Sequence, residues 1–260
     1  MSIPSDLNQF SALVEIIKRL RSPDGCPWDR KQTHASLREN LLEECYEVLE
    51  ALDEGDAKKL RTELGDLLMQ IVLHSQIASE CGEFELGDVI GSISQKLIQR
   101  HPHVFGSAKA RDVDEVIHNW EVLKQGERDA NTSMLASLPR QMPALAYSQR
   151  MQTRVARVGF DWADVAGVID KLAEEMRELK QAESREQKEK EFGDLLFTLV
   201  NIARRSGIDA EAALREANKR FYRRFSYMER VCRERGLNFN KLSVDEQNAL
   251  WEEAKQNITD

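Results

Sequence analysis

Apolar and polar positions follow each other along this chain with the period of amphipathic helices. In the first half, apolar residues recur every three or four positions in segments at about 7–21, 36–53, 57–80, 87–101 and 113–126. A second series follows at about 143–157, 164–182, 186–206, 209–235 and 244–257. Segments of this length and period predict helices, and strand-like alternation is scarce. The pattern therefore predicts an all-α protein.

Several helix ends are marked by residues that favour them. Asp209 is suited to cap the N-terminus of the fourth helix of the second series, and Gly236 to end it. Ser243 and Glu246 have the spacing of a capping box before the last helix. These signals fix the predicted limits of the last two helices.

The two series are joined by GERDANTSMLASLPRQMP, whose small polar residues and two prolines are typical of a connection. With 260 residues, the chain is long enough for two domains. We therefore predict two tandem helical-bundle domains, at residues 1–131 and 132–260.

The two halves repeat a set of motifs in the same order. ELGDLLMQIV at 63–72 returns as EFGDLLFTLV at 191–200, with six of ten positions identical. Each half also has a Trp before an EExxE motif, and a Lys–Arg pair and a WExxK block after the decapeptide. Matched blocks in the same order indicate an internal duplication.

The repeated acids suggest a metal site. On successive helices, Glu175 and Glu178 share one face, as do Glu191 and Asp194, so an antiparallel pair would bring four carboxylates together. Hard oxygen ligands without His or Cys favour Mg²⁺, with Mn²⁺ as the alternative. A single ExxE motif is typical of a solvated helix face, but two acid pairs repeated as a set favour metal binding. The first-half equivalents are Glu44, Glu47, Glu63 and Asp66.

A glycine recurs inside each decapeptide, at Gly65 and Gly193. Glycine in a helix interior costs up to about 1 kcal/mol relative to alanine. Its recurrence suggests that the two helices, or a ligand, approach closely at this point.

Cations follow the acids in both halves. Lys219 and Arg223 are four residues apart on the next helix, and Lys96 and Arg100 match them in the first half. A metal site alone needs no cations, whereas a metal-bound polyphosphate does. Trp251 has the chemistry to stack on a base, although a Trp on a terminal helix often serves packing alone.

Charge and composition exclude several classes. A net charge of −8 argues against a general nucleic-acid binder, and no stretch is long and apolar enough to span a membrane. The irregular spacing of the four cysteines is typical of free thiols in a reducing cytoplasm. No GxGxxG, Walker A or GxSxG motif is present. We expect a cytoplasmic protein.

EExxE followed by ExGD, with Lys and Arg on the next helix, resembles the MazG family of all-α nucleoside triphosphate pyrophosphohydrolases. GCPWD at 25–29 and RHPHVFG at 100–106 are similar to further marks of its two-domain bacterial members. The resemblance implies Mg²⁺-dependent hydrolysis of ribo- and deoxyribonucleoside triphosphates to the monophosphate and pyrophosphate. It also implies a homodimer in which helices from both subunits complete the bundles.

The resemblance assigns roles to residues of the second half. Glu175, Glu178, Glu191 and Asp194 match the metal ligands, and Glu174 is our choice of general base. Residues expected to contact the nucleotide are Lys171, Glu174, Glu175, Lys190, Asp194, Lys219, Arg223 and Trp251. The first half has equivalents of this set in Glu44, Glu47, Glu63, Asp66, Lys96, Arg100, Trp120 and Lys124.

In two-domain relatives the C-terminal half is typically catalytic, and the sequence offers a reason to expect this here. Pro102 ends the first-half helix directly after Arg100 and His101, whereas the equivalent helix continues well past Arg223. A longer helix supports its cations on both sides. We therefore expect the productive site in the second half.

Two alternatives remain open. An oxygen-handling dimetal bundle would share the carboxylates but needs two ExxH motifs, and only EVIH at 115–118 is present. A non-catalytic helical nucleotide-binding or scaffold protein would keep the site without turnover.

Overall fold

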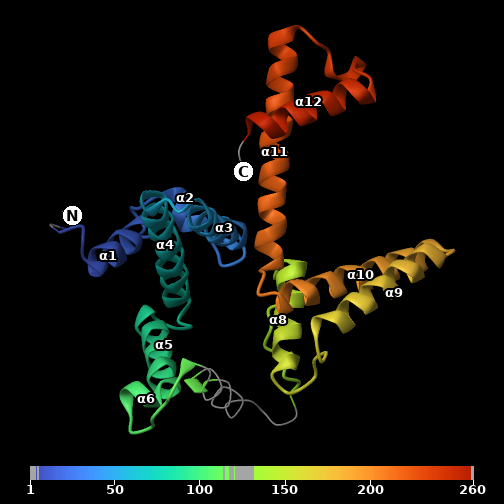
Figure 1. Ribbon diagram of the computed structural model, residues 1–260. Helices are drawn as coiled ribbons and strands as arrows, with labels where there is room; N and C mark the ends of the chain where they lie inside the picture. The colour runs from blue at the N-terminus through green and yellow to red at the C-terminus, as the bar shows by residue number, and fades with distance from the viewer. Residues whose placement is uncertain (1–3, 5, 114, 117–119, 121–131, 259–260) are drawn as a thin grey trace. The chain divides into compact units, whose positions relative to one another are not determined.

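The computed structural model describes residue 4 and residues 6–113, 115–116, 120 and 132–258 (Figure 1). The chain divides into two compact units, Met1–Arg128 and Asp129–Asp260, and each is described by itself. The predicted boundary after residue 131 borders residues outside the described ranges and stays a prediction.

The first unit is built on a helical hairpin, α3–α4, with α1 packed against α4. Its helices are α1 (Phe10–Leu20), α2 (Pro27–Lys31), α3 (Arg38–Glu54), α4 (Ala57–Cys81), α5 (Leu86–Arg100) and α6 (Pro102–Phe105). The hairpin turn is short because Gly55 adopts φ 66° and the Asp56 side chain caps α4. Ile17 of α1 and Val72 and Ile77 of α4 form the buried core.

The second unit repeats this hairpin as α9–α10, with α8 packed against α10 (Figure 1). Its helices are α8 (Ala144–Ala156), α9 (Val165–Gln181), α10 (Arg185–Arg205), α11 (Ala210–Arg235), the 3₁₀ helix η1 (Phe239–Lys241) and α12 (Val244–Asn257). Ser184 and Gln187 form a capping box at the α9–α10 turn. Met228 and Leu250 lie in a separate buried cluster between α11 and α12.

The all-α prediction is confirmed, since the described residues form helices and no strand. Asp209 accepts a hydrogen bond from the Ala212 amide, Gly236 ends α11 with φ 62°, and Ser243 and Glu246 form the predicted capping box. The short helices α2 and α6 were not predicted. The helix expected at 113–126 lies mostly outside the described residues. Within the described ranges, no helix has both the length and the hydrophobicity needed to cross a membrane.

Candidate active site

Three carboxylates of the second unit converge between α9 and α10. One oxygen from each of Glu175, Glu178 and Glu191 lies within 4.8 Å of the other two. Glu175 and Glu178 lie one turn apart on α9, and Glu191 lies in the second turn of α10. The hairpin therefore brings together three of the four predicted metal ligands, which we call the second-half acid cluster.

Two carboxylates of this cluster have an unsatisfied oxygen. Glu175 is only 4% exposed, and its Oε2 is buried without a hydrogen-bond partner. The Oε2 atom of Glu191 is also buried and also has no hydrogen-bond partner. Buried carboxylate oxygens without partners are costly, so these two atoms are suited to accept a positively charged ligand.

Two lysines partly compensate the cluster. Lys171 Nζ lies 2.6 Å from Glu174 Oε1 and 2.8 Å from Glu175 Oε1. Hydrogen bonds to Glu174 and then Glu175 raise the pKa of Lys171 above its ordinary value. Lys190 lies 2.8 Å from Glu191 Oε1, and its pKa is likewise raised, first by that hydrogen bond. Both lysines are thus charged and placed beside the acids.

Asp194 and Glu174 lie outside the converging trio. The side chain of Asp194 is 51% exposed, and its Oδ2 lies 3.4 Å from Lys190 Nζ. The hydrogen bond from Lys171 lowers the pKa of Glu174, which makes this carboxylate a weaker base while the lysine holds it. The role of Glu174 as general base stays a prediction.

The first unit contains an equivalent cluster of Glu44, Glu63 and Asp66, with ligand atoms within the same 4.8 Å. The fourth predicted acid, Glu47, is not a member. Burial raises the pKa of Glu44, a hydrogen bond from the buried Gln70 opposes this, and Asp66 raises it further. Both halves therefore gather carboxylates at the same place in the hairpin.

The predicted cations lie on a different part of the second unit. α11 leaves the hairpin at the C-terminal end of α10, whereas the acids lie toward the α9–α10 turn (Figure 1). On α11, Lys219 lies 3.0 Å from Glu216 of the same helix, and Arg223 is exposed. Trp251 packs beneath Arg224 and beside Phe221. One chain thus does not gather these residues around its own acids.

Lys96 and Arg100, the predicted cations of the first half that the structure describes, both lie on α5. Lys96 is exposed on α5, and the Arg100 guanidinium lies 5.6 Å from the centre of the Trp120 ring. Lys124 lies outside the described residues.

The prediction of close helix packing at the two glycines is wrong for the described part of this chain. A Cβ built on Gly65 or Gly193 would meet no atom within 4 Å, because both face outward from their hairpins. The other reading, approach of a ligand, stays a prediction.

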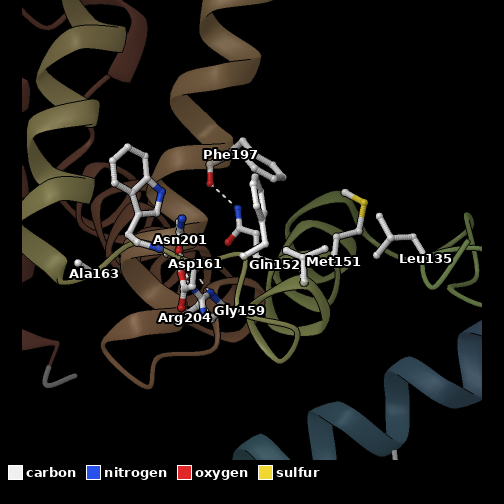
Figure 2. A pocket seen from close by; sticks show the side chains of 12 residues that line it. Leu135, Met151, Gln152, Gly159, Asp161, Ala163, Phe197, Asn201 and Arg204 are labelled. Atoms are coloured by element: carbon white, nitrogen blue, oxygen red, sulfur yellow. Dashed lines mark hydrogen bonds and ion pairs between the residues drawn. The ribbon is translucent and has the colours of Figure 1, made fainter. Parts of the chain in front are cut away.

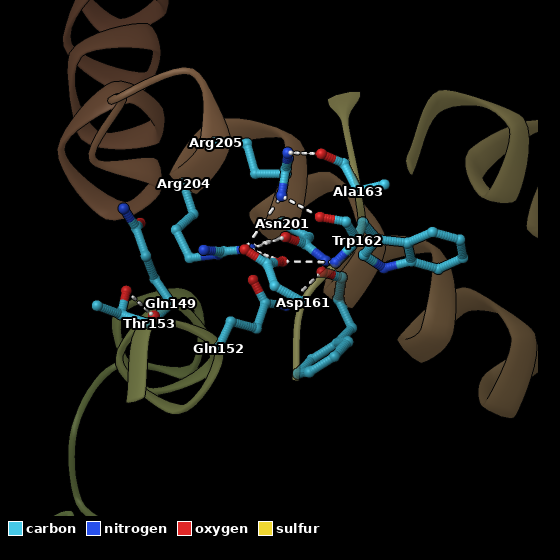
Figure 3. Close-up of polar contacts among 10 residues, drawn as sticks. Gln149, Gln152, Thr153, Asp161, Trp162, Ala163, Asn201, Arg204 and Arg205 are labelled. Carbon is cyan, nitrogen blue, oxygen red and sulfur yellow. Dashed lines mark hydrogen bonds and ion pairs between the residues drawn. The ribbon is translucent and has the colours of Figure 1, made fainter. Parts of the chain in front are cut away.

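Sequence reasoning missed a cavity of about 600 Å³ in the second unit (Figure 2). It lies between α8, the GFDW loop and α10, and Gln152 and Asn201 line it. The loop is held by Asp161, which accepts a hydrogen bond from Arg204 and lies 3.0 Å from Arg205 Nη1 (Figure 3). A signal was present in the sequence, since Asn201 follows Asp194 by seven residues, on the same helix face.

Comparison with known proteins identifies the family of this chain. A model of the MazG nucleotide pyrophosphohydrolase domain matches residues 32–105. The chain is 44% identical over 247 residues to the nucleoside triphosphate pyrophosphohydrolase/pyrophosphatase MazG of Thermotoga maritima, covering 95% of each protein. It is 44% identical over 262 residues to the nucleoside triphosphate pyrophosphohydrolase of Escherichia coli (strain K12), covering 98% of this chain and 100% of the relative. The chain belongs to the MazG family.

A solved structure of a MazG-related protein from Thermotoga maritima is also similar. It aligns with 44% of this MazG chain and 98% of its own, at 31% identity and a TM-score of 0.39.

The acid cluster of this MazG chain is chemically suited to a divalent cation. Its ligands are carboxylate oxygens, which Mg²⁺ and Mn²⁺ prefer. The unpartnered oxygens of Glu175 and Glu191 would each gain a cationic partner. The described residues therefore fit the metal that the sequence predicted.

Proposed function

We propose that this protein is a Mg²⁺-dependent nucleoside triphosphate pyrophosphohydrolase. It would cleave the α–β anhydride of ribo- and deoxyribonucleoside triphosphates and release the monophosphate and pyrophosphate. The observation that carries the proposal is the pair of buried, unpartnered carboxylate oxygens of Glu175 and Glu191 in a converging acid cluster. The names of the two full-length relatives support the same activity.

Each group near the cluster has a distinct task in this proposal. Glu175, Glu178, Glu191 and Asp194 would hold Mg²⁺, which supplies charge compensation for the triphosphate and a more acidic bound water. Lys171 and Lys190 already lie beside these acids and would turn toward the phosphates as the substrate arrives. Freed from Lys171, Glu174 would regain basicity and accept the proton of the attacking water.

We also propose that a second copy of the chain completes the site. Large apolar side chains of the hairpin are open to solvent, with Met176 59%, Phe192 52% and Leu199 44% exposed. Faces of this kind mark interaction surfaces. Because the cations of α11 lie away from the acids of the same chain, α11 of a partner would supply Lys219 and Arg223 in a homodimer.

Product analysis tests the activity. We expect pyrophosphate and nucleoside monophosphate from several ribo- and deoxyribonucleoside triphosphates when Mg²⁺ is added, and none in the presence of a chelator. Release of orthophosphate alone would contradict the proposed bond cleavage, and nucleotide binding without any product would favour a non-catalytic protein.

Mixing two inactive variants tests the shared site. Glu175→Gln removes an acid, and Arg223→Ala removes a cation. If acids and cations come from different subunits, a mixed dimer has one intact site, and the mixture should recover roughly a quarter of the wild-type activity. The Glu175→Gln variant mixed with Glu178→Gln is the control, because it restores no site. Recovery in neither mixture would indicate that each chain builds its own site.

A further inference from the structure

The buried side chain of Gln70 lies at the carboxylates of the first unit, Glu44, Glu63 and Asp66, which we call the first-half acid cluster. Gln70 follows Asp66 by one turn of α4 and is only 3% exposed. Its side chain makes a hydrogen bond with Glu44 of α3, and its Oε1 is buried without a hydrogen-bond partner. A carboxylate accepts and only the amide nitrogen of glutamine donates, so the N–H group faces Glu44. The amide therefore links the two helices of the hairpin at the cluster.

Glu44 and its counterpart in the second half have partners of different charge. Glu175 occupies the position of Glu44 in the repeated EExxE motif, and Lys171 Nζ lies 2.8 Å from its Oε1. The repeat places Asn40 where the second half has Lys171. The glutamate of the first half thus has a neutral amide as its hydrogen-bond partner, whereas that of the second half has an ammonium group.

A second pair of matched positions differs in the same direction. Lys190 Nζ lies 2.8 Å from Glu191 Oε1, whereas the residue before Glu63, the counterpart of Glu191, is Thr62. The second-half acid cluster therefore has two lysines beside its carboxylates. The equivalent positions of the first half hold an amide and a hydroxyl group, which carry no charge.

A lysine and a glutamine hold a carboxylate in different ways. An ammonium group offsets the negative charge and repels an arriving cation. An amide N–H orients the carboxylate and leaves its charge intact, and the carbonyl oxygen of the same amide is an acceptor of the kind that hard cations prefer. Carboxylates held by an amide are therefore ready for a cation, whereas those paired with lysines must first lose their partners.

We propose that Gln70 is a positioning residue that prepares the first-half acid cluster to hold a divalent cation in the absence of a nucleotide. Its amide keeps the Glu44 carboxylate in place without neutralising it. The second-half acid cluster binds its cation more weakly until the phosphates of a nucleotide draw Lys171 and Lys190 away. The first-half cation would thus join α3 to α4 permanently, whereas the second-half cation takes part in turnover. The inference rests on the proposed function, since it takes both acid clusters to be cation sites.

Electron paramagnetic resonance of Mn²⁺, titrated into full-length protein without nucleotide, tests the first step. We expect a first Mn²⁺ ion to bind about tenfold or more tightly than a second. Glu44→Gln should abolish the tighter binding, and Glu175→Gln should leave it unchanged. Addition of an α,β-methylene nucleoside triphosphate should tighten the weaker binding only.

Two variants test the role of Gln70. Gln70→Met removes the amide while keeping the length of the side chain, and should weaken the tighter Mn²⁺ binding by about threefold to tenfold. Asn40→Lys with Thr62→Lys introduces the lysines of the second half, should weaken the same binding, and decides the matter should Gln70→Met fail to fold. Gln152→Met is the matched control, because Gln152 is a glutamine of the second unit that is 4% exposed and also has an unpartnered Oε1.

Thermal melting separates a positioning role of Gln70 from a packing role. The measurement uses the Glu175→Gln background, in which the second-half acid cluster is disabled. A residue that serves packing alone changes the melting temperature equally with and without Mn²⁺. We expect Gln70→Met to reduce the rise in melting temperature that Mn²⁺ produces, and Gln152→Met to leave that rise unchanged.

Wild-type Mn²⁺ affinity in Gln70→Met or in the double lysine variant would overturn the inference, as would a tighter site that survives Glu44→Gln. Pyrophosphate release by the wild-type protein separates this failure from failure of the proposed function. If the protein hydrolyses nucleotides while these variants bind Mn²⁺ normally, only the inference is wrong. If the tighter binding depends on Gln70 and no nucleotide is hydrolysed, the inference stands and the proposed activity is wrong.

Discussion

The ammonium group of Lys171 lies 2.8 Å from the carboxylate of Glu175, one turn further along α9. In the absence of a metal, this lysine neutralises the charge of Glu175, which is buried within the cluster. The same lysine is expected to contact the phosphates of the substrate. Removing it should therefore have opposite effects on metal binding and on turnover.

For Lys171→Met we expect the nucleotide-free protein to bind Mn²⁺ about threefold to tenfold more tightly, because a competing positive charge is lost. Turnover of nucleoside triphosphates should fall by about tenfold or more, because a phosphate contact is lost. Electron paramagnetic resonance of Mn²⁺ and a pyrophosphate assay measure the two effects. Lys180→Met, at an exposed position near the end of α9, is the control. Unchanged Mn²⁺ affinity would mean that the lysine does not compete with the metal.

Replacing any one of Glu175, Glu178, Glu191 or Asp194 by its amide should abolish Mg²⁺-dependent turnover while thermal stability stays equal or rises. Like charges about 5 Å apart repel by about 3 kcal/mol at an effective dielectric constant near 20, before solvent screening. Glu178→Gln should show the largest gain of the trio, because neutralising Glu175 or Glu191 also removes an ion pair with Lys171 or Lys190. Calorimetric melting in a chelator provides the test. Unfolding of these variants would identify the acids as structural ion-pair partners.

The division of work between the halves can be tested with two double variants. We expect Glu175→Gln with Glu178→Gln to lose most pyrophosphate release at saturating Mg²⁺, and Glu44→Gln with Glu47→Gln to keep most of it. Both halves gather a cluster of carboxylates, so the acids alone do not decide which half is productive. Loss in the first-half variant alone would reverse the assignment. Partial loss in both would indicate two working sites.

The ion pairs of Asp161 should make the stability of the second unit depend on pH. The hydrogen bond from Arg204 is the main cause that lowers the pKa of Asp161. Because the folded pKa lies below the unfolded one, this stabilisation is present above about pH 4 and is lost as the pH falls through the folded pKa. Asp161→Asn should reduce the free energy of unfolding by about 1–3 kcal/mol at pH 7.

Urea unfolding at pH 7 and at pH 3 measures this effect, and the gap between variant and wild type should narrow at the lower pH. Asp170→Asn, at an exposed position on α9, is the control. A gap of the same size at both pH values would mean that the charge of Asp161 contributes little.

Helix limits were predictable where a side chain itself sets them. Asp209, Gly236 and Ser243 act through local hydrogen bonds and backbone conformation, so their effect is visible in the sequence. The helices at 27–31 and 102–105 are too short to show a hydrophobic period.

The acid cluster was predictable to the level of the helix face but not of the side chain. Glu175 and Glu191 meet because the acid-bearing faces of α9 and α10 pack together, and the spacing of the acids in the sequence indicates this packing. Asp194 instead turns toward Lys190, because its direction depends on its rotamer and on solvent. The spacing of Asp194 and Asn201 indicates a polar face on α10, but it does not reveal the cavity, because Gln152 looks like any polar residue of an amphipathic helix until α10 is packed against it. Likewise, the position of α11 is set by tertiary contacts that the helical period does not encode.

Gly193 lies on an open stretch of the α10 surface. A substitution there should affect the stability of the single chain and the binding of a partner or ligand in opposite directions. Since an added Cβ meets no described atom within 4 Å, Gly193→Ala should stabilise α10 by up to about 1 kcal/mol. The same methyl group would stand in the way of a second copy or a phosphate that approaches the helix backbone. If Gly193→Ala melts at a higher temperature and hydrolyses nucleotides more slowly, the exposed backbone at Gly193 serves binding, and the glycine lowers the stability of α10.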